Sequence, residues 1–175
     1  MRRFSDSEQM SRKGLALKPD EPDALLNLAV ALRAQGEVEE AIEIFNKLLV
    51  VRPGSSGVLS GLGNALKDVG RHEEAERAFR RAIIAKPDSV GPWLQLGFQH
   101  LVNGDFKMGW LLSEWRRLLT ETDGHYPSFT QPVWTGEELD DKTIFVFFEQ
   151  GIGDSVQFSR FLPRLASAKR VIAFV

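Results

Sequence analysis

The sequence contains no cysteine, which excludes disulfide bonds and thiolate metal sites and leads us to expect a cytoplasmic protein. Its three histidines, His72, His100 and His125, are scattered and lack a second metal-ligating residue at a suitable spacing, so we expect no metal site. No apolar run approaches the ~20 residues that a membrane-spanning helix needs. The two arginines near the start are not followed by the apolar core of a signal peptide.

An excess of charge of either sign is also missing. The net charge is −2 over 175 residues, the isoelectric point is about 6.0, and no basic block stands out. These values give no electrostatic reason to expect nucleic acid or an anionic membrane as a partner. The hydrophobic share of 43% is ordinary for a soluble globular chain of one or two domains.

What the chain does have is an internal repeat of 34 residues. Seven columns of like residues align at this offset, too many in one register to arise by chance. The columns are Pro19, Pro53 and Pro87; Leu25, Leu59 and Trp93; Leu28, Leu62 and Leu96; Ala29, Gly63 and Gly97; Gly36, Gly70 and Gly104; Ala41, Ala75 and Gly109; and Phe45 with Phe79. Each unit therefore predicts the same pair of helices.

Each column has a role in helix packing or in ending a helix. Leu25, Leu28 and Leu32 form one apolar stripe along the first helix of a unit. Ala29 and its counterparts are small enough to let the second helix approach closely. Gly36 and its counterparts stand where the first helix must stop in a left-handed conformation. The prolines end the second helix because a proline ring blocks its continuation.

This pattern resembles the tetratricopeptide repeat, with units at 22–55, 56–89 and 90–119. Residues 1–21 are similar to part of a preceding unit, with its second helix at 5–18. The third unit departs from the pattern, because His100 replaces an apolar residue and Ser113 replaces the aromatic. Trp110 and Trp115 are expected to compensate on the same helix. A divergent last repeat is typical of a cap or a junction.

The resemblance implies that the first helices line a concave groove that binds a protein or peptide. The groove-facing candidates are Leu26, Val30, Arg33, Asn64, Lys67, Leu94 and Phe98. Asn64 and Lys67 are suited to a peptide backbone or carboxylate, although both also fit an ordinary solvated helix face. The apolar end near Phe98 needs a cover, either a ligand or the following aromatics Tyr126, Phe129 and Trp134. We favour the aromatics, which leaves Arg33, Asn64 and Lys67 as the better candidates for contacting a partner.

After residue 120 the helical period stops. Residues 120–142 form a proline- and glycine-punctuated linker, and residues 143–175 predict a strand (143–148), a glycine turn, a helix (155–166) and a strand (170–175). The apolar run of the first strand is typical of burial on both faces. The fold class is thus mostly α: a helical-hairpin solenoid followed by a partial, Rossmann-like βαβ segment. Gly151 and Gly153 lack the third glycine of a dinucleotide fingerprint and alone indicate a tight turn.

The string from 104 to 163 resembles bacterial proteins that join tetratricopeptide repeats to a glycosyltransferase-like domain, similar to the heptosyltransferases. That resemblance implies Asp154 as the base for an acceptor hydroxyl, and the alternative is that Asp154 only caps its helix. It also implies a nucleotide-sugar donor for a full-length parent. The half of the fold that binds the donor is missing here, so we expect no cofactor and no transferase activity in this chain.

Three hypotheses follow. The first is a scaffold that binds a protein or peptide through its repeats. The alternative is an N-terminal fragment of a repeat-linked glycosyltransferase, whose repeats recruit the acceptor. A third is a homodimer formed through the exposed edge of the βαβ segment.

Overall fold

The computed structural model describes residues 2–118, 130–147, 156–157 and 159–174. The chain divides into two compact units, Met1–Leu119 and Thr120–Val175, and each is described by itself.

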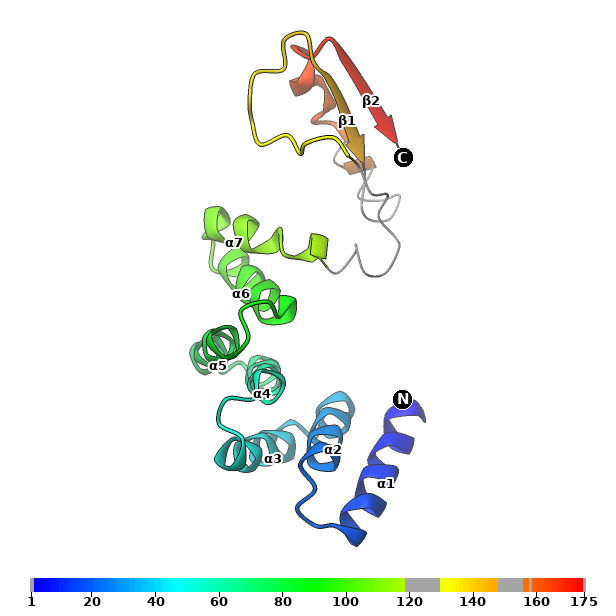
Figure 1. The fold of residues 1–175 in the computed structure, drawn as a ribbon, viewed down its shortest axis with the longest axis vertical. Helices are drawn as coiled ribbons and strands as arrows, with labels where there is room; N and C mark the ends of the chain where they lie inside the picture. The colour runs from blue at the N-terminus through cyan, green and yellow to red at the C-terminus, as the bar shows by residue number, and fades with distance from the viewer. Residues whose placement is uncertain (1, 119–129, 148–155, 158, 175) are drawn as a thin grey trace. The chain divides into compact units, whose positions relative to one another are not determined.

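The first unit is an array of helices in which each helix packs on the next along the chain. In order they are α1 (Arg2–Leu17), α2 (Pro22–Gln35), α3 (Val38–Val51), α4 (Ser56–Asp68), α5 (His72–Ala85), α6 (Val90–Val102) and α7 (Phe106–Ser113). The array curves, with α2, α4 and α6 on the inner side of the arc and α3 and α5 on the outer side (Figure 1). The first helices of the units therefore form the concave face, as the repeat predicts.

The glycine column ends the first helices as expected. Gly36, Gly70 and Gly104 have φ angles of 95°, 76° and 80°, a left-handed conformation that glycine adopts without a steric penalty. The second helices α3 and α5 end two residues before Pro53 and Pro87, because the residue preceding a proline disfavours helical backbone.

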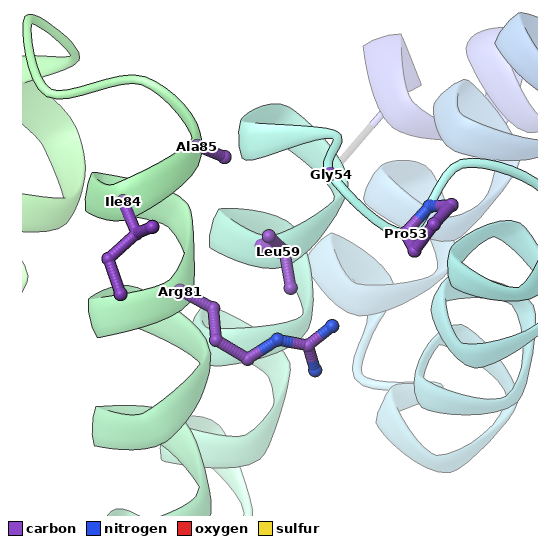
Figure 2. Close-up of a pocket in the computed structure, with 6 residues that line it drawn as sticks. All are labelled: Pro53, Gly54, Leu59, Arg81, Ile84 and Ala85. Carbon is purple, nitrogen blue, oxygen red and sulfur yellow. The ribbon is translucent and has the colours of Figure 1, made fainter.

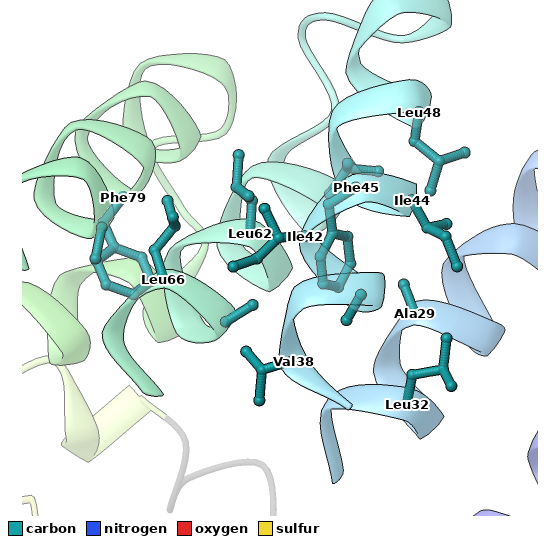
Figure 3. Packing of buried hydrophobic residues seen from close by; sticks show 14 of the residues in the cluster. Ala29, Leu32, Val38, Ile42, Ile44, Phe45, Leu48, Leu62, Leu66 and Phe79 are labelled. Atoms are coloured by element: carbon teal, nitrogen blue, oxygen red, sulfur yellow. The ribbon is translucent and has the colours of Figure 1, made fainter. Parts of the chain in front are cut away.

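The core of the array is built from the aromatic and small columns together. Phe45 and Phe79 are fully buried, in a cluster with residues of α2, α3 and α4 such as Leu32 and Leu62 (Figure 3). A Cβ added to Gly63 would stand 2.5 Å from Cε1 of the Phe79 ring. The small residue is thus required because the ring lies directly against the helix backbone.

The third unit packs differently because Ser113 replaces the aromatic. Ser113 is buried and its hydroxyl donates to the carbonyl oxygen of Gly109 at 2.7 Å. Without a ring between them, α6 and α7 approach until a Cβ on Gly97 would stand 3.2 Å from the carbonyl oxygen of Gly109. Trp110 and Trp115 do not fill the core in place of the aromatic as expected. Trp110 is 59% exposed, and Trp115 lies beyond the end of α7.

Trp115 instead stacks on Trp93 of α6, with ring centroids 5.1 Å apart and planes inclined by 8°. The indole N–H of Trp93 donates to the carbonyl oxygen of Pro87 at 2.9 Å. This stacked pair holds the chain after α7 against α6.

The second unit contains the parallel strand pair that the sequence predicts. Strands β1 (Thr143–Phe147) and β2 (Arg170–Phe174) pair in register, Thr143 with Arg170 and Phe147 with Phe174. The helix predicted over 155–166 is wrong in its second half, where the chain forms the 3-10 helix η1 (Leu162–Leu165). Pro163 explains the change, because it cannot donate to Ser159 and its ring collides with that carbonyl.

Strand β1 is not buried on both faces, contrary to the expectation from its apolar run, and β2 is also partly exposed. Phe145 of β1 is 43% exposed, and Val171 and Ile172 of β2 are 36% and 38% exposed. Two strands and a short helix bury too little apolar surface to cover themselves. The Rossmann-like assignment therefore rests on a single parallel pair.

Candidate functional site

The inner face of the array carries one row of side chains that lie 34 residues apart. Val30 of α2, Asn64 of α4 and Phe98 of α6 occupy the same place in successive units. Val30 is 43% exposed, Phe98 is 54% exposed, and Asn64 between them is half-buried. The row thus presents an apolar, a polar and an apolar group along the concave face.

Leu26 and Leu94 lie one turn earlier on the same helices. Both are half-buried, and Leu26 packs against the buried core cluster. They form the floor beneath the row, so their contribution to a ligand is apolar contact area.

Two further candidates, Arg33 and Lys67, bridge neighbouring units. Nη1 of Arg33 lies 3.3 Å from Oδ2 of Asp68, and Nζ of Lys67 donates to Oε1 of Gln95 at 2.8 Å. The first contact joins α2 to α4 and the second joins α4 to α6. Partly exposed pairs of this kind contribute little to stability, so their main effect is to fix these long side chains along the inner face.

Asn64 differs from its charged neighbours. Within the part of the chain that the structure describes, its side-chain amide has no hydrogen-bond partner. An amide that carries both donors and an acceptor can bind an extended backbone bidentately. Asn64 is therefore the polar group of the row with unused hydrogen-bonding capacity.

A hollow of about 270 Å³ lies on another part of the array (Figure 2). Arg81, Ile84 and Ala85 of α5 line one side, and Pro53, Gly54 and Leu59 line the other. Its lining is apolar apart from one guanidinium and contains no acid, base or nucleophile. The hollow is also smaller than most small-molecule sites, so it does not constitute a catalytic centre.

The carboxyl groups with shifted pKa values, Glu74 and Glu137, belong neither to the row of the inner face nor to the hollow. The guanidinium of Arg71 donates two hydrogen bonds to Glu74, at 2.6 and 2.7 Å, and these lower the pKa of that carboxyl. The hydroxyl of Thr135 donates to Glu137 at 2.8 Å and lowers the pKa of Glu137. Both carboxyls reach solvent, Glu74 as an ion-pair partner and Glu137 as a turn partner, which suits local turn structure and not proton transfer.

The remaining candidates, Asp154, Gly151 and Gly153, lie outside the described residues. Tyr126 and Phe129, expected to cover the apolar end of the groove, lie outside them too. Their assigned roles stay predictions. In the described ranges no group of three metal-ligating side chains comes together, and none of the helices there is long and apolar enough to cross a membrane.

Comparison with protein families gives a match in the helical array. Residues 20–85 match the tetratricopeptide repeat family. The matched stretch spans α2 to α5, the first two complete helical pairs of the array. The match ends before residue 104, so the resemblance of 104–163 to glycosyltransferase-like proteins stays a prediction. A comparison with curated proteins finds no match.

Solved structures of the protein MamA share the fold. The crystal structure of MamA has a TM-score of 0.58 at 18% identity, over 70% of this chain and 72% of MamA. A MamA fragment from Desulfovibrio magneticus RS-1 has a TM-score of 0.55 at 18% identity, over 71% of this chain and 69% of the fragment. At this identity the likeness establishes the helical-repeat architecture.

Proposed function

We propose that the chain is a scaffold that binds a protein segment along the inner face of its repeats. The observation that carries this proposal is the row of Val30, Asn64 and Phe98, in which exposed apolar groups flank an amide with no partner among the described residues. An extended segment lying across α2, α4 and α6 would bury Val30 and Phe98 and hydrogen-bond to Asn64.

The bridges of Arg33 and Lys67 support this arrangement. Each bridge joins neighbouring units and fixes its long side chain along the inner face before any ligand arrives. A preformed surface avoids part of the entropy cost of ordering side chains on binding. Arg33 and Lys67 therefore act first as positioning residues, and they also supply positive charge along the face.

A displayed library of peptides, selected against the full chain, tests the proposal. Peptides that survive selection should lose at least tenfold in affinity for Phe98→Asp and for Asn64→Ala, measured by calorimetry. Val50→Asp is the matched control, because Val50 lies on the outer helix α3 and is 83% exposed. Selected peptides that bind all three variants equally would refute a site on the inner face.

The alternative of sugar transfer rests on the resemblance of residues 104–163 and on Asp154. Self-association through the strand pair likewise stays a prediction. We do not place sugar transfer ahead of the scaffold, because the described residues supply no acid–base centre.

A further inference from the structure

Helix α7 exposes large apolar side chains away from its contact with α6. Phe106, Trp110 and Leu111 are 61%, 59% and 62% exposed, while Leu112 is buried on the opposite side. Large apolar side chains that lie together on a surface are normally covered by other protein. Part of the surface of α7 therefore needs a cover beyond its contact with α6.

The internal repeat identifies which part. Phe106 and Trp110 stand two repeats after Val38 and Ile42 of α3. Val38 and Ile42 are only 9% and 8% exposed. Helix α3 packs between α2 and α4, whereas the extensive helix contact of α7 among the described residues is with α6. In α5 the same places hold the polar His72 and Glu76, so the comparison is with α3 alone. There the apolar pair is buried where α4 packs on α3, and Phe106 and Trp110 lie at the equivalent place on α7.

Helix α4 also shows what kind of helix fits there. Its Leu62 and Leu66, one turn apart, are 7% and 4% exposed and share a buried cluster with Val38 and Ile42 (Figure 3). Gly61 of α4 has to be small, because a Cβ there would stand 2.5 Å from the ring of Phe45.

That restriction is absent at α7. The counterpart of Phe45 is Ser113, so no ring lies where the corresponding position of an incoming helix would point. A helix docking on α7 can therefore carry a larger residue than glycine at this position.

We propose that the end face of α7, formed by Phe106 and Trp110, binds an amphipathic helix of a partner protein in the place of a following first helix. The helix presents leucine-sized residues one turn apart, as Leu62 and Leu66 do. A second copy of this chain does not offer such a helix among the described side chains. Helices α2, α4 and α6 each bury their leucine stripes in their own core, and the exposed Met10 and Leu17 of α1 lie about two turns apart. The proposal goes beyond the inner-face site, since the end face lies on α7, the second helix of its unit.

Leu111 supplies a matched control on the same helix. Its counterparts in α3 and α5 are Glu43 and Arg77, both exposed, so this side of the second helix stays uncovered when a following unit is present. Leu111 is as exposed as Trp110 but belongs to a different surface.

The test uses a fluorescein-labelled peptide with the sequence of residues 55–69, carrying Gly57→Ala and Gly61→Ala to raise its helix propensity. Anisotropy titration with the full chain should show saturable binding. Trp110→Ala in the chain, or Leu62→Asp in the peptide, should weaken binding at least tenfold, and Leu111→Ala should leave it unchanged. Phe98→Asp and Asn64→Ala should also leave it unchanged, which separates this site from the inner face.

Several results would overturn the proposal. The absence of saturable binding is one, and an equal loss with Trp110→Ala and Leu111→Ala is another. If the Trp110 emission, isolated by comparison with Trp110→Phe, is shielded from acrylamide in the free monomer, a segment of the same chain covers the face. If the chain self-associates in sedimentation and Trp110→Ala abolishes this, a second copy is the occupant.

Discussion

Replacing Gly63 with alanine tests the packing that holds each helical pair together. In α4 this residue faces the ring of Phe79 on α5. An added Cβ would stand 2.5 Å from Cε1, 2.8 Å from Cδ1 and 2.9 Å from Cζ of that ring. Phe79 is fully buried, so its ring has no free space into which to retreat.

Two opposing effects set the change in the free energy of unfolding for Gly63→Ala. Alanine in a helix interior is favoured over glycine by about 1 kcal/mol. Overpacking a filled core costs about 1–3 kcal/mol. We therefore expect Gly63→Ala to lower the free energy of unfolding by about 1 kcal/mol. A Cβ added to Gly57 in the same helix would have no heavy atom within 4 Å. Gly57→Ala should therefore raise the free energy of unfolding through its higher helix propensity.

A second substitution separates the clash from other effects. Phe79→Leu shortens the opposing side chain, so Gly63→Ala should cost less in that background, with a coupling of about 1 kcal/mol. Urea unfolding of the full chain, monitored by far-UV circular dichroism, gives the free energy of unfolding of the unchanged chain, the two single variants and the double variant. The reasoning fails if Gly63→Ala is as stable as Gly57→Ala, or if the two substitutions at 63 and 79 are additive.

Two further predictions concern the third repeat unit and the compact unit formed by Thr120–Val175. Gly109→Ala should destabilise the α6–α7 pair by about 2–3 kcal/mol, because its Cβ would stand 2.9 Å from the backbone nitrogen of Leu101; unchanged hydrogen exchange in α7 would contradict this. Thr135→Val should raise the pKa of Glu137 towards its ordinary value, since the hydroxyl hydrogen bond that lowers it is lost. A lowered pKa contributes stability above the unfolded-state pKa that is lost as the pH falls through the folded-state pKa. An NMR titration showing the same pKa in both proteins would exclude this cause.

The helical array was predictable because its constraints recur at one spacing. The glycines at 36, 70 and 104 and the small column at 29, 63 and 97 mark helix ends and close contacts directly in the sequence. Gly61 is equally constrained, by the ring of Phe45. No column of small residues marks this position, because Asn27 and Gln95 stand at the equivalent places in the other units.

The third unit and the second domain were less predictable. Ser113 signalled the loss of the aromatic, but the closer approach of α6 and α7 that follows from it depends on both backbones. The bridges of Arg33 to Asp68 and of Lys67 to Gln95 depend on how neighbouring units are placed, which no local pattern encodes. The apolar period after residue 155 predicts a longer helix than the one that forms, because Pro163 interrupts it.

The central claim is that a ligand lies along the inner face of the array. An NMR chemical-shift map of the labelled full chain, titrated with a peptide selected for binding, tests it most directly. The amides of α2, α4 and α6 around Val30, Asn64 and Phe98 should shift in a saturable manner, while those around Val50 on α3 stay in place. Shifts confined to α3 and α5 would contradict the account.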